Sequence, residues 1–529
     1  MKRRITYIQR PDAPFEAQQA VLTSKSLTIH NLEAAREDRL TFDLDDLPDE
    51  FRNVLQQSQE LRLRWATERP FDAIEPFASR VSPGLHVQYT PLALTQSSEA
   101  LCSLLRTAFE VNEDGLNGVN CTKAEETFIT PPPQAAHAGA AASLQYHTEL
   151  PSLKSFVEYI EQIFCDWLQE RRKECSGTAE SLLTADTVDL DYDSSSNTLV
   201  LSGLCSTAPE GGWSEEIKPP SSKSDKVEFG LLGAERGISA DEIKIGGLLA
   251  VVGEDKKLKP TMFSFPSRHH ALPESVKYSV SFAQPTGLHP TMSITIPHSS
   301  LHRPPAPDDT TCSLHTYLTL PSSVFGDQYQ LGTTDPLFLQ SHNLAGLRAH
   351  AGETDLEAPD WAVNRWGSTW LFELATPAEN EFTTERSDWT ATIPLHLRYL
   401  NPSDSGYRSA HVPWPVVFWA CSAEDHEVGM GLNPFDRTNL GYDTLFGPRT
   451  FFYQLHPDAD RLVETVDVPV LHLKEGEGYF HTRNIELATT IVISLGFFWI
   501  LWRLLRVAWS SGVGANNTPN KTHDRQKKE

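Results

Sequence analysis

The chain has 529 residues, of which 39% are hydrophobic and 22% are charged, enough to bury a large core in more than one domain. Its 45 basic and 70 acidic residues give a net charge of −25, which would repel a phosphate backbone. The composition therefore argues against a disordered polymer and against a nucleic-acid partner.

The N-terminal part, residues 1–207, is expected to be an α+β region. It begins with MKRRITYIQRPDAPF, a basic stretch that no apolar segment follows, so no cleavable signal peptide is expected. Two alternating runs around a Ser/Asn turn predict a β-hairpin over 187–204. Apolar residues at helical spacing predict three helices, over 47–68, 98–111 and 150–173.

Two features of this region have a possible functional meaning. Asn120 begins the sequon Asn-Cys-Thr, which is usable for N-glycosylation only if the region faces a lumen. Asp189, Asp191 and Asp193 form D-x-D triplets, the spacing at which two carboxylates can share a divalent metal in a glycosyltransferase. Because these aspartates alternate with apolar residues, the solvated face of a strand is the favoured interpretation.

The rest of the extramembrane chain is expected to be β-rich. Residues 208–226 are rich in Gly, Pro, Ser and charge, which predicts a linker. Residues 227–480 consist of short alternating runs with Pro at their edges, which predicts an antiparallel β-sandwich-like domain. These runs are YSVSFAQ, TMSITIP, HTYLTLP, STWLFELA, DWTATIPLHLRYL and VPWPVVFWA.

No catalytic, metal or cofactor site follows from the motifs, since phosphate-loop, dinucleotide, serine-hydrolase and zincin patterns are absent from the sequence. The seven cysteines contain no C-x-x-C pair. Cys312 and Cys421 could be bridged in an oxidising lumen or could be buried thiols, and their spacing leaves both open. Surface or hydrogen-bonded histidines are favoured over a metal site for His269, His270, His289, His298, His302 and His315.

A membrane helix is expected over 487–509. The stretch from Leu487 to Trp502 carries no charge, and only Arg503 and Arg506 interrupt the apolar character up to Trp509. From Arg503 onward the chain has six basic and two acidic residues, so the tail, 510–529, is expected in the cytosol. The large body before the helix would then be lumenal.

The segment IPLHLRYLNPSDSGYRSAHVPWPVVFWAC, residues 393–421, resembles the strand-loop-strand signature of the PIG-X/Pbn family, fungal type. Further matches lie in residues 315–331 and 355–374. The signature residues of this chain are His396, Arg398, Tyr399, Pro402, Pro413, Pro415 and Cys421.

The resemblance implies a β-rich lumenal domain with one membrane helix in the endoplasmic reticulum. It implies a noncatalytic subunit whose partner is the polytopic catalytic subunit of glycosylphosphatidylinositol (GPI) mannosyltransferase I, the enzyme that adds the first mannose to GPI precursors. It also implies a role in the folding of other proteins of the endoplasmic reticulum. Members of the family can lack a cleavable signal.

Alternation along the signature strand predicts His396 and Arg398 on the face opposite Leu397 and Tyr399. These polar residues would either fix the following turn or contact the catalytic partner. Two other functions remain open from the sequence. One is a metal-dependent glycosyltransferase that uses the strand from Asp189 to Asp193, and the other is a generic membrane-tethered adaptor.

Overall fold

The computed structural model forms two units. The first, called the body here, consists of Met1–Leu400 and Ser409–Val468, and the second consists of Asn401–Arg408 and Pro469–Glu529. The structure describes residues 1–10, 15–23, 26–92, 98–109, 119–132, 143–167, 172–220, 225–235, 244–252, 261–284, 287–307, 310–355, 358–377, 388–422, 433, 435, 437–472 and 482–512.

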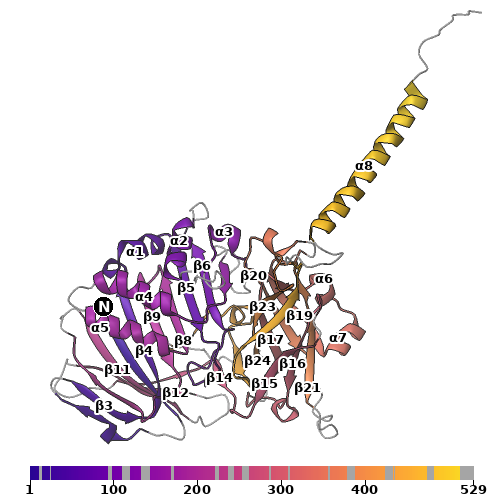
Figure 1. Cartoon of the computed structure of the whole chain (residues 1–529). Coiled ribbons are helices and arrows are strands. Elements are labelled where there is room, and N and C mark those ends of the chain that lie inside the picture. The colour runs from indigo at the N-terminus through magenta and orange to yellow at the C-terminus, as the bar shows by residue number, and fades with distance from the viewer. Residues whose placement is uncertain are drawn as a thin grey trace, which may run out of the picture. The chain divides into compact units, whose positions relative to one another are not determined.

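A ten-stranded sheet forms the N-terminal half of the body (Figure 1). All neighbouring strands are antiparallel except β1 and β11. In spatial order its strands are β13 (Thr261–Pro266), β12 (Lys244–Val251), β11 (Lys226–Glu235), β1 (Lys2–Gln9), β4 (Ala34–Asp43), β9 (Thr198–Cys205), β8 (Thr187–Asp193), β5 (Ser58–Ala66), β6 (Gly84–Pro91) and β7 (Leu144–Thr148). The basic start of the chain is therefore an interior strand of this sheet.

One face of the sheet is apolar and is covered by helices, as Figure 1 shows. Side chains of alternating strand positions, among them Phe42, Leu63 and Val87, share a core with Phe51 and Phe156 from the helices. The helices of this half are α1 (Asp49–Leu55), α2 (Glu99–Ala108), α3 (Ala124–Thr127), α4 (Lys154–Tyr159), which continues as a π-helical turn (Ile160–Cys165), and α5 (Arg172–Ser181). Short 3-10 turns are Ala17–Gln19, Leu44–Asp46 and Leu182–Thr184.

The predicted helix over 47–68 is wrong in its second half, where residues 58–66 form strand β5. Leu61, Leu63 and Trp65 are buried toward the helices, and Arg62 and Arg64 point to the other face. That period of two fits a strand and not a helix. The predicted hairpin is present as β8 and β9.

The opposite face of the sheet carries a row of polar side chains beside an apolar cluster that includes Ile8, Leu204 and Leu232. Directly paired residues on successive strands lie on the same face, so the register aligns one row of polar side chains across eight strands. The row is Glu228, Arg4, Arg39, Ser202, Asp189, Arg64, His86 and His147. A segment from the C-terminal half crosses this face, with Arg437 on Asp189 and Thr438 accepting from Arg62 and Arg64.

The boundary between the two halves differs from the expected linker at 208–226. Residues Trp213–Ile217 form β10, which pairs with β3 (Leu27–Leu32), itself paired with β2 (Ala20–Leu22). Strands β11 to β13 then complete the N-terminal sheet. Positive φ values at Gly211 and Gly212 show that glycine marks a tight turn here, and the composition mimics that of a linker.

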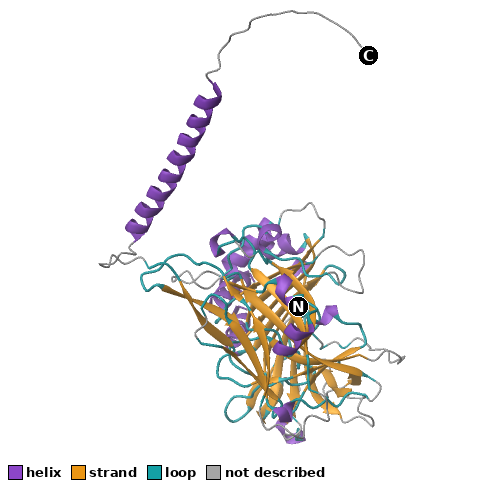
Figure 2. Ribbon diagram, turned by 90° about the vertical axis from the view of Figure 1, so that its right-hand side faces the viewer, coloured by secondary structure: helices purple, strands orange, loops and turns teal. Residues whose placement is uncertain are grey.

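The C-terminal half is β-sandwich-like, and strands are the main regular element of the body (Figure 2). Alternation is clear in β16, where Met292, Ile294 and Ile296 are buried. The six-stranded sheet has the order β14 (His269–Ala271), β25 (Thr450–Gln454), β24 (Val416–Ser422), β17 (Thr311–Pro321), β20 (Gly367–Leu374) and β19 (Leu344–Gly352). The four-stranded sheet has the order β21 (Trp389–Pro394), β16 (Thr291–Ile296), β15 (Lys277–Phe282) and β26 (His456–Pro457).

Smaller elements complete this half. Two two-stranded sheets pair β18 (Val324–Phe325) with β22 (His396–Leu397), and β23 (Tyr407–Pro413) with β27 (Val463–Pro469). The helices are α6 (Gln328–Leu331) and α7 (Pro336–His342), and the 3-10 turns are His298–Ser300, Asp360–Ala362 and Asp443–Leu445.

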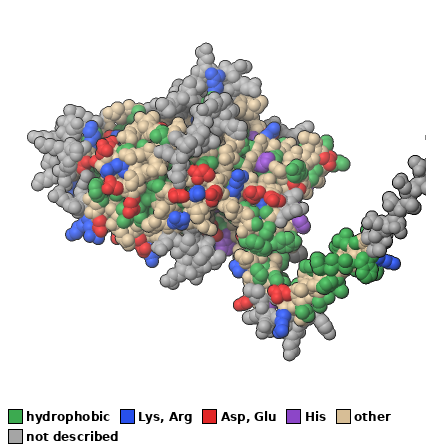
Figure 3. All heavy atoms as spheres, turned by 90° about the horizontal axis from the view of Figure 1, so that it is seen from above, with side chains coloured by type: hydrophobic (Ala, Val, Ile, Leu, Met, Phe, Trp, Pro, Cys, Tyr) green, Lys and Arg blue, Asp and Glu red, His purple; other side chains and the backbone are tan. Residues whose placement is uncertain are grey.

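The second unit contains helix α8 (Thr482–Gly512), whose part from Arg483 to Trp509 is long and apolar enough to span a membrane. Its 31 residues correspond to about 46 Å at 1.5 Å per residue, against about 30 Å of hydrocarbon. Figure 3 shows apolar side chains along the face of this helix that it presents. Arg503 and Arg506 lie over the rings of Trp499 and Trp502. The tail from 513 onward lies outside the described residues.

Candidate functional site

Three segments that carry the family resemblance, residues 315–331, 355–374 and 393–421, converge in the C-terminal half of the body. We call their meeting point the signature cluster and define it by Phe325, Asp360, His396, Arg398 and Tyr399. Strand β18 brings Phe325 opposite His396 on β22. The backbone N–H of Asp360 donates to the Tyr399 carbonyl over 3.1 Å, and the Ser322 hydroxyl donates to the Asp360 carboxylate over 2.6 Å.

Arg398 is the centre of this cluster and is only 2% exposed. Its guanidinium lies 4.1 Å above the ring of Phe325 and donates to the carbonyls of Asp355 and Ala358, the latter over 2.8 Å. Burial lowers the pKa of Arg398, and nearby carboxylates, led by that of Glu353, raise it. The cation is thus used to fasten the loop around 355–360 to the strand.

Arg398 and Tyr399 differ from the expected alternation, whereas His396 and Leu397 differ in burial as opposite faces do. The half-buried His396 ring stacks on Phe325 at 5.5 Å and contacts the His289 ring through Nδ1 atoms 3.1 Å apart. Tyr399 was expected on the same face as Leu397, but it is 64% exposed whereas Leu397 is buried. The strand ends at Leu397, so the period of two no longer applies at Arg398 and Tyr399.

The remaining signature residues are in positions typical of structural elements. Pro413 ends β23 and Pro415 immediately precedes β24, where its carbonyl accepts from Tyr278 over 2.8 Å. Pro402 lies in the second unit. Cys421 on β24 is directly opposite Cys312 on β17, and the two are joined by a disulfide. Disulfides also join Cys102 to Cys121 and Cys165 to Cys175, and Cys205 is a free thiol.

The D-x-D aspartates do not form an open metal site. Asp189 is 5% exposed and lies 2.8 Å from the guanidinium of Arg437. Arg64 lies 3.8 Å from both Asp189 and Asp191, so cations of the chain occupy the positions where a metal would bind. The solvated-strand interpretation is also wrong for Asp189, because the segment with Arg437 covers that face.

The histidines are spread through the C-terminal half. His269, His270 and His315 are buried, not on the surface as one interpretation expected. His270 Nδ1 is 3.3 Å from the Glu75 carboxylate, and His315 Nδ1 is 3.0 Å from the Ser313 carbonyl. Among the described residues, no three or more His, Cys, Asp or Glu side chains are grouped so that they could hold a metal ion.

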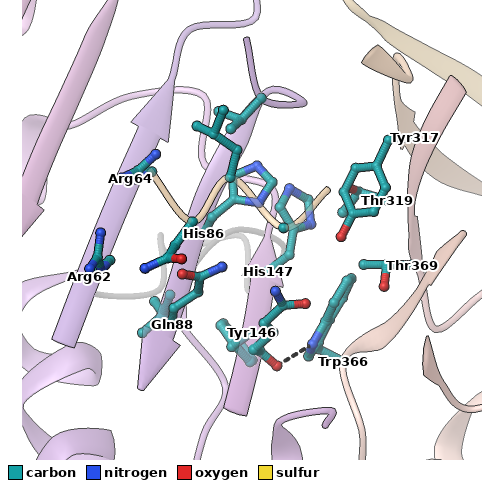
Figure 4. A pocket seen from close by; sticks show the side chains of 16 residues that line it. Arg62, Arg64, His86, Gln88, Tyr146, His147, Tyr317, Thr319, Trp366 and Thr369 are labelled. Atoms are coloured by element: carbon teal, nitrogen blue, oxygen red, sulfur yellow. Dashed lines mark hydrogen bonds between the residues drawn. The ribbon is translucent and has the colours of Figure 1, made fainter. Parts of the chain in front are cut away.

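A polar cavity lies where the polar face of the N-terminal sheet meets the C-terminal half (Figure 4). Its lining includes Arg64, His86, His147, Thr319 and Trp366. The cavity volume of about 30 Å³ corresponds to about one or two water molecules. A sugar or nucleotide substrate would not fit without displacement of its walls.

The two histidines of the cavity are held neutral. Their rings are 4.6 Å apart, and Nε2 of each donates to a backbone carbonyl, that of Ser82 for His86 and that of Pro83 for His147. Burial lowers the pKa of His86 to about 4 and that of His147 to about 3. Neutral, hydrogen-bonded imidazoles are poor proton donors at neutral pH.

Asn120 is exposed, as glycosylation would require. Its backbone N–H donates to the Tyr146 hydroxyl over 3.1 Å, and the following Cys121 is disulfide-bonded, so the backbone of the sequon is held at the surface.

Sequence reasoning missed the loop that Arg398 fastens and the exposed Trp361 on it. The matched segment 355–374 contained both, but only the fold brings it beside Arg398. The row of polar side chains across the sheet was also missed, because Arg64 was placed in a helix.

Comparison with known proteins identifies the family. The family model described as PIG-X / PBN1 matches residues 285–505, which include all three segments of the signature cluster. The protein pbn1 of Aspergillus oryzae is 53% identical over 555 residues, covering 100% of both chains. Those of Emericella nidulans and Neurospora crassa are 54% and 37% identical, each over 98% of both chains. The chain belongs to the PIG-X/PBN1 family.

Proposed function

We propose that this protein is a noncatalytic, membrane-anchored subunit of the endoplasmic reticulum that stabilises GPI mannosyltransferase I, the enzyme that adds the first mannose to GPI-anchor precursors. Family membership over the full length of the chain supports a role in GPI-anchor biosynthesis. The family resemblance described above supports the finer assignment to the mannosyltransferase.

The observation that carries the noncatalytic assignment is the use of the signature residues. The Arg398 guanidinium donates to two backbone carbonyls and lies over an aromatic ring, and His396 stacks on that same ring. Asp189, the first aspartate of the D-x-D strand considered for a glycosyltransferase, is paired with both Arg64 and Arg437. These contacts favour a structural role of the signature residues, in which the body provides a stable surface for a partner.

The membrane helix tethers this body close to a partner in the same membrane. A domain tethered beside a polytopic enzyme has a high effective concentration for docking, so modest contacts would hold the complex together. The excess of basic residues after the helix favours a cytosolic tail and a lumenal body. Three disulfides and an exposed Asn120 fit an oxidising lumen.

Affinity purification of the full-length chain in mild detergent tests the proposal. We expect the catalytic mannosyltransferase subunit to copurify. Absence of this subunit from a preparation that retains a folded body would refute the assignment.

A separate deglycosylation experiment tests the topology. The wild-type protein should shift in mobility after enzymatic removal of N-glycans, and Asn120→Gln should abolish that shift. The tail contains two further sequons, at Asn516 and Asn520, which would face the lumen only in the opposite orientation. A shift that persists in Asn120→Gln and disappears only when these tail asparagines are replaced would contradict a lumenal body.

A further inference from the structure

Two large aromatic side chains are exposed beside the signature cluster. Trp361 is 58% exposed and Tyr399 is 64% exposed. The bond from the Asp360 N–H to the Tyr399 carbonyl brings the segments that carry them side by side. We call Trp361 and Tyr399 the aromatic surface. Exposed tryptophan and tyrosine are the residue types most often found at the energetic centres of protein interfaces.

The backbone beneath the aromatic surface is held firmly. Arg398 fastens the carbonyls of Asp355 and Ala358, and the Ser322 hydroxyl fastens the carboxylate of Asp360, the residue before Trp361. A loop ordered before binding loses little conformational entropy when a partner docks. The buried Arg398 thus holds the loop that presents the exposed Trp361 to a partner.

The charge around the aromatic surface is negative. Among the described residues between 353 and 365, three are acidic, Glu353, Asp355 and Asp360, and one is basic, Arg365. The guanidinium of Arg398 is buried under the loop, so it does not offer a cation to a ligand at the surface. An acidic rim disfavours anionic lipid or phosphate and favours a cationic group, which can also bind the face of an aromatic ring.

We propose that the aromatic surface binds a lumenal, arginine- or lysine-bearing segment of the polytopic mannosyltransferase subunit. This inference rests on the proposed function and adds to it the site of contact and the chemistry of the partner segment. Trp361 and Tyr399 supply the apolar and cation–π contacts, and the acidic rim supplies charge complementarity. Arg398 acts as a positioning residue for Trp361.

The test is copurification of the catalytic subunit with full-length variants in mild detergent. The double variant Trp361→Ala/Tyr399→Ala should retain normal abundance and thermal stability but capture at least about tenfold less catalytic subunit. The matched control is Tyr329→Ala/Leu337→Ala, which removes two side chains of the same half that are 77% and 76% exposed. The control should capture as much as wild type.

A charge variant keeps the proposal testable if the double variant folds poorly. Asp355→Lys leaves both aromatic rings in place and should reduce capture, more strongly at low salt than at high salt. Capture by both variants at the wild-type level would overturn the inference while leaving the proposed function intact. Failure of wild type itself to capture the subunit would instead refute the proposed function.

Two other occupants are distinguished by the same variants. If wild-type protein binds phosphatidylserine vesicles and Trp361→Ala/Tyr399→Ala does not, the surface binds lipid and the inference is wrong. If wild type self-associates in detergent and the double variant does not, the occupant is a second copy and the inference is equally wrong.

Discussion

Replacement of Arg398 by methionine should loosen one loop of the body and leave the rest intact. The side chain is buried, donates to the carbonyls of Asp355 and Ala358, and lies over the Phe325 ring. Methionine keeps much of the apolar stem and removes the charge and all donors.

The magnitude follows from the balance of two opposing effects. Hydrogen bonds from a charged donor contribute about 1.5–3 kcal/mol each, and burial of the guanidinium costs several kcal/mol. A net loss of about 2–3 kcal/mol in the local stability of the loop is expected, which increases its open population about 30- to 150-fold. Because the contacts are local, we expect the strands of the ten-stranded sheet to be unaffected.

Amide hydrogen exchange of the full-length protein in detergent measures this effect. The N–H groups of Asp360 and Val363, which are bonded to the Tyr399 and Asp360 carbonyls, should exchange faster by the factor given above. The control is Arg365→Met, which removes an exposed arginine from the same segment. Equal protection of this loop from hydrogen exchange in the Arg398 variant and the control would refute the role of Arg398 in holding the loop.

Three other predictions concern stability. Gly326→Ala should destabilise the body by about 1–3 kcal/mol, because the new Cβ would lie 2.7 Å from a leucine methyl. The control is Gly447→Ala, where the new Cβ has nothing within 4 Å. Similar melting temperatures for the two variants would contradict the reasoning. Cys421→Ser opens the 109-residue loop closed by its bond to Cys312 and should cost about 2–5 kcal/mol, measured as a lower melting temperature. His86 has a folded pKa of about 4, below its unfolded value of about 6.5, so its neutral form contributes stability above pH 6.5 that is lost as pH falls towards 4. His86→Gln should flatten the stability–pH curve in that window by about 1.4 kcal/mol per pH unit, and an unchanged slope would contradict the buried neutral imidazole.

Local patterning predicted much of the fold. Strands β16 and β21 of the C-terminal half alternate strictly, and a period of two needs no tertiary information. The C-terminal apolar helix, a candidate membrane span, was equally clear, because the stretch from Leu487 to Trp502 carries no charge. The α+β character of the N-terminal part also followed from its periodicities.

The errors come from tertiary context. Residues 58–66 carry charged side chains at Arg62 and Arg64, and the buried Arg64 is accommodated by Thr438 of the covering segment and by Asp189 of the neighbouring strand. The expected linker is interrupted by β10, whose partner β3 lies about 185 residues earlier in the chain. Pairings of that sequence separation leave no trace in local composition.

The candidate site was predictable as a set of segments but not as a structure. The resemblance selected Arg398 and Tyr399, yet alternation placed Tyr399 on the wrong face because the strand ends after Leu397. The loop that Arg398 holds lies about 40 residues away in the chain. Its contribution, including Trp361, follows only from the fold.

The most direct test of a stabilising, noncatalytic role is the half-life of the catalytic mannosyltransferase subunit in cells that lack this protein. We predict that the subunit is degraded faster and that first-mannose transfer falls in proportion, so that activity per remaining catalytic subunit is unchanged. A catalytic subunit that persists at normal abundance while mannose transfer is lost would contradict the account.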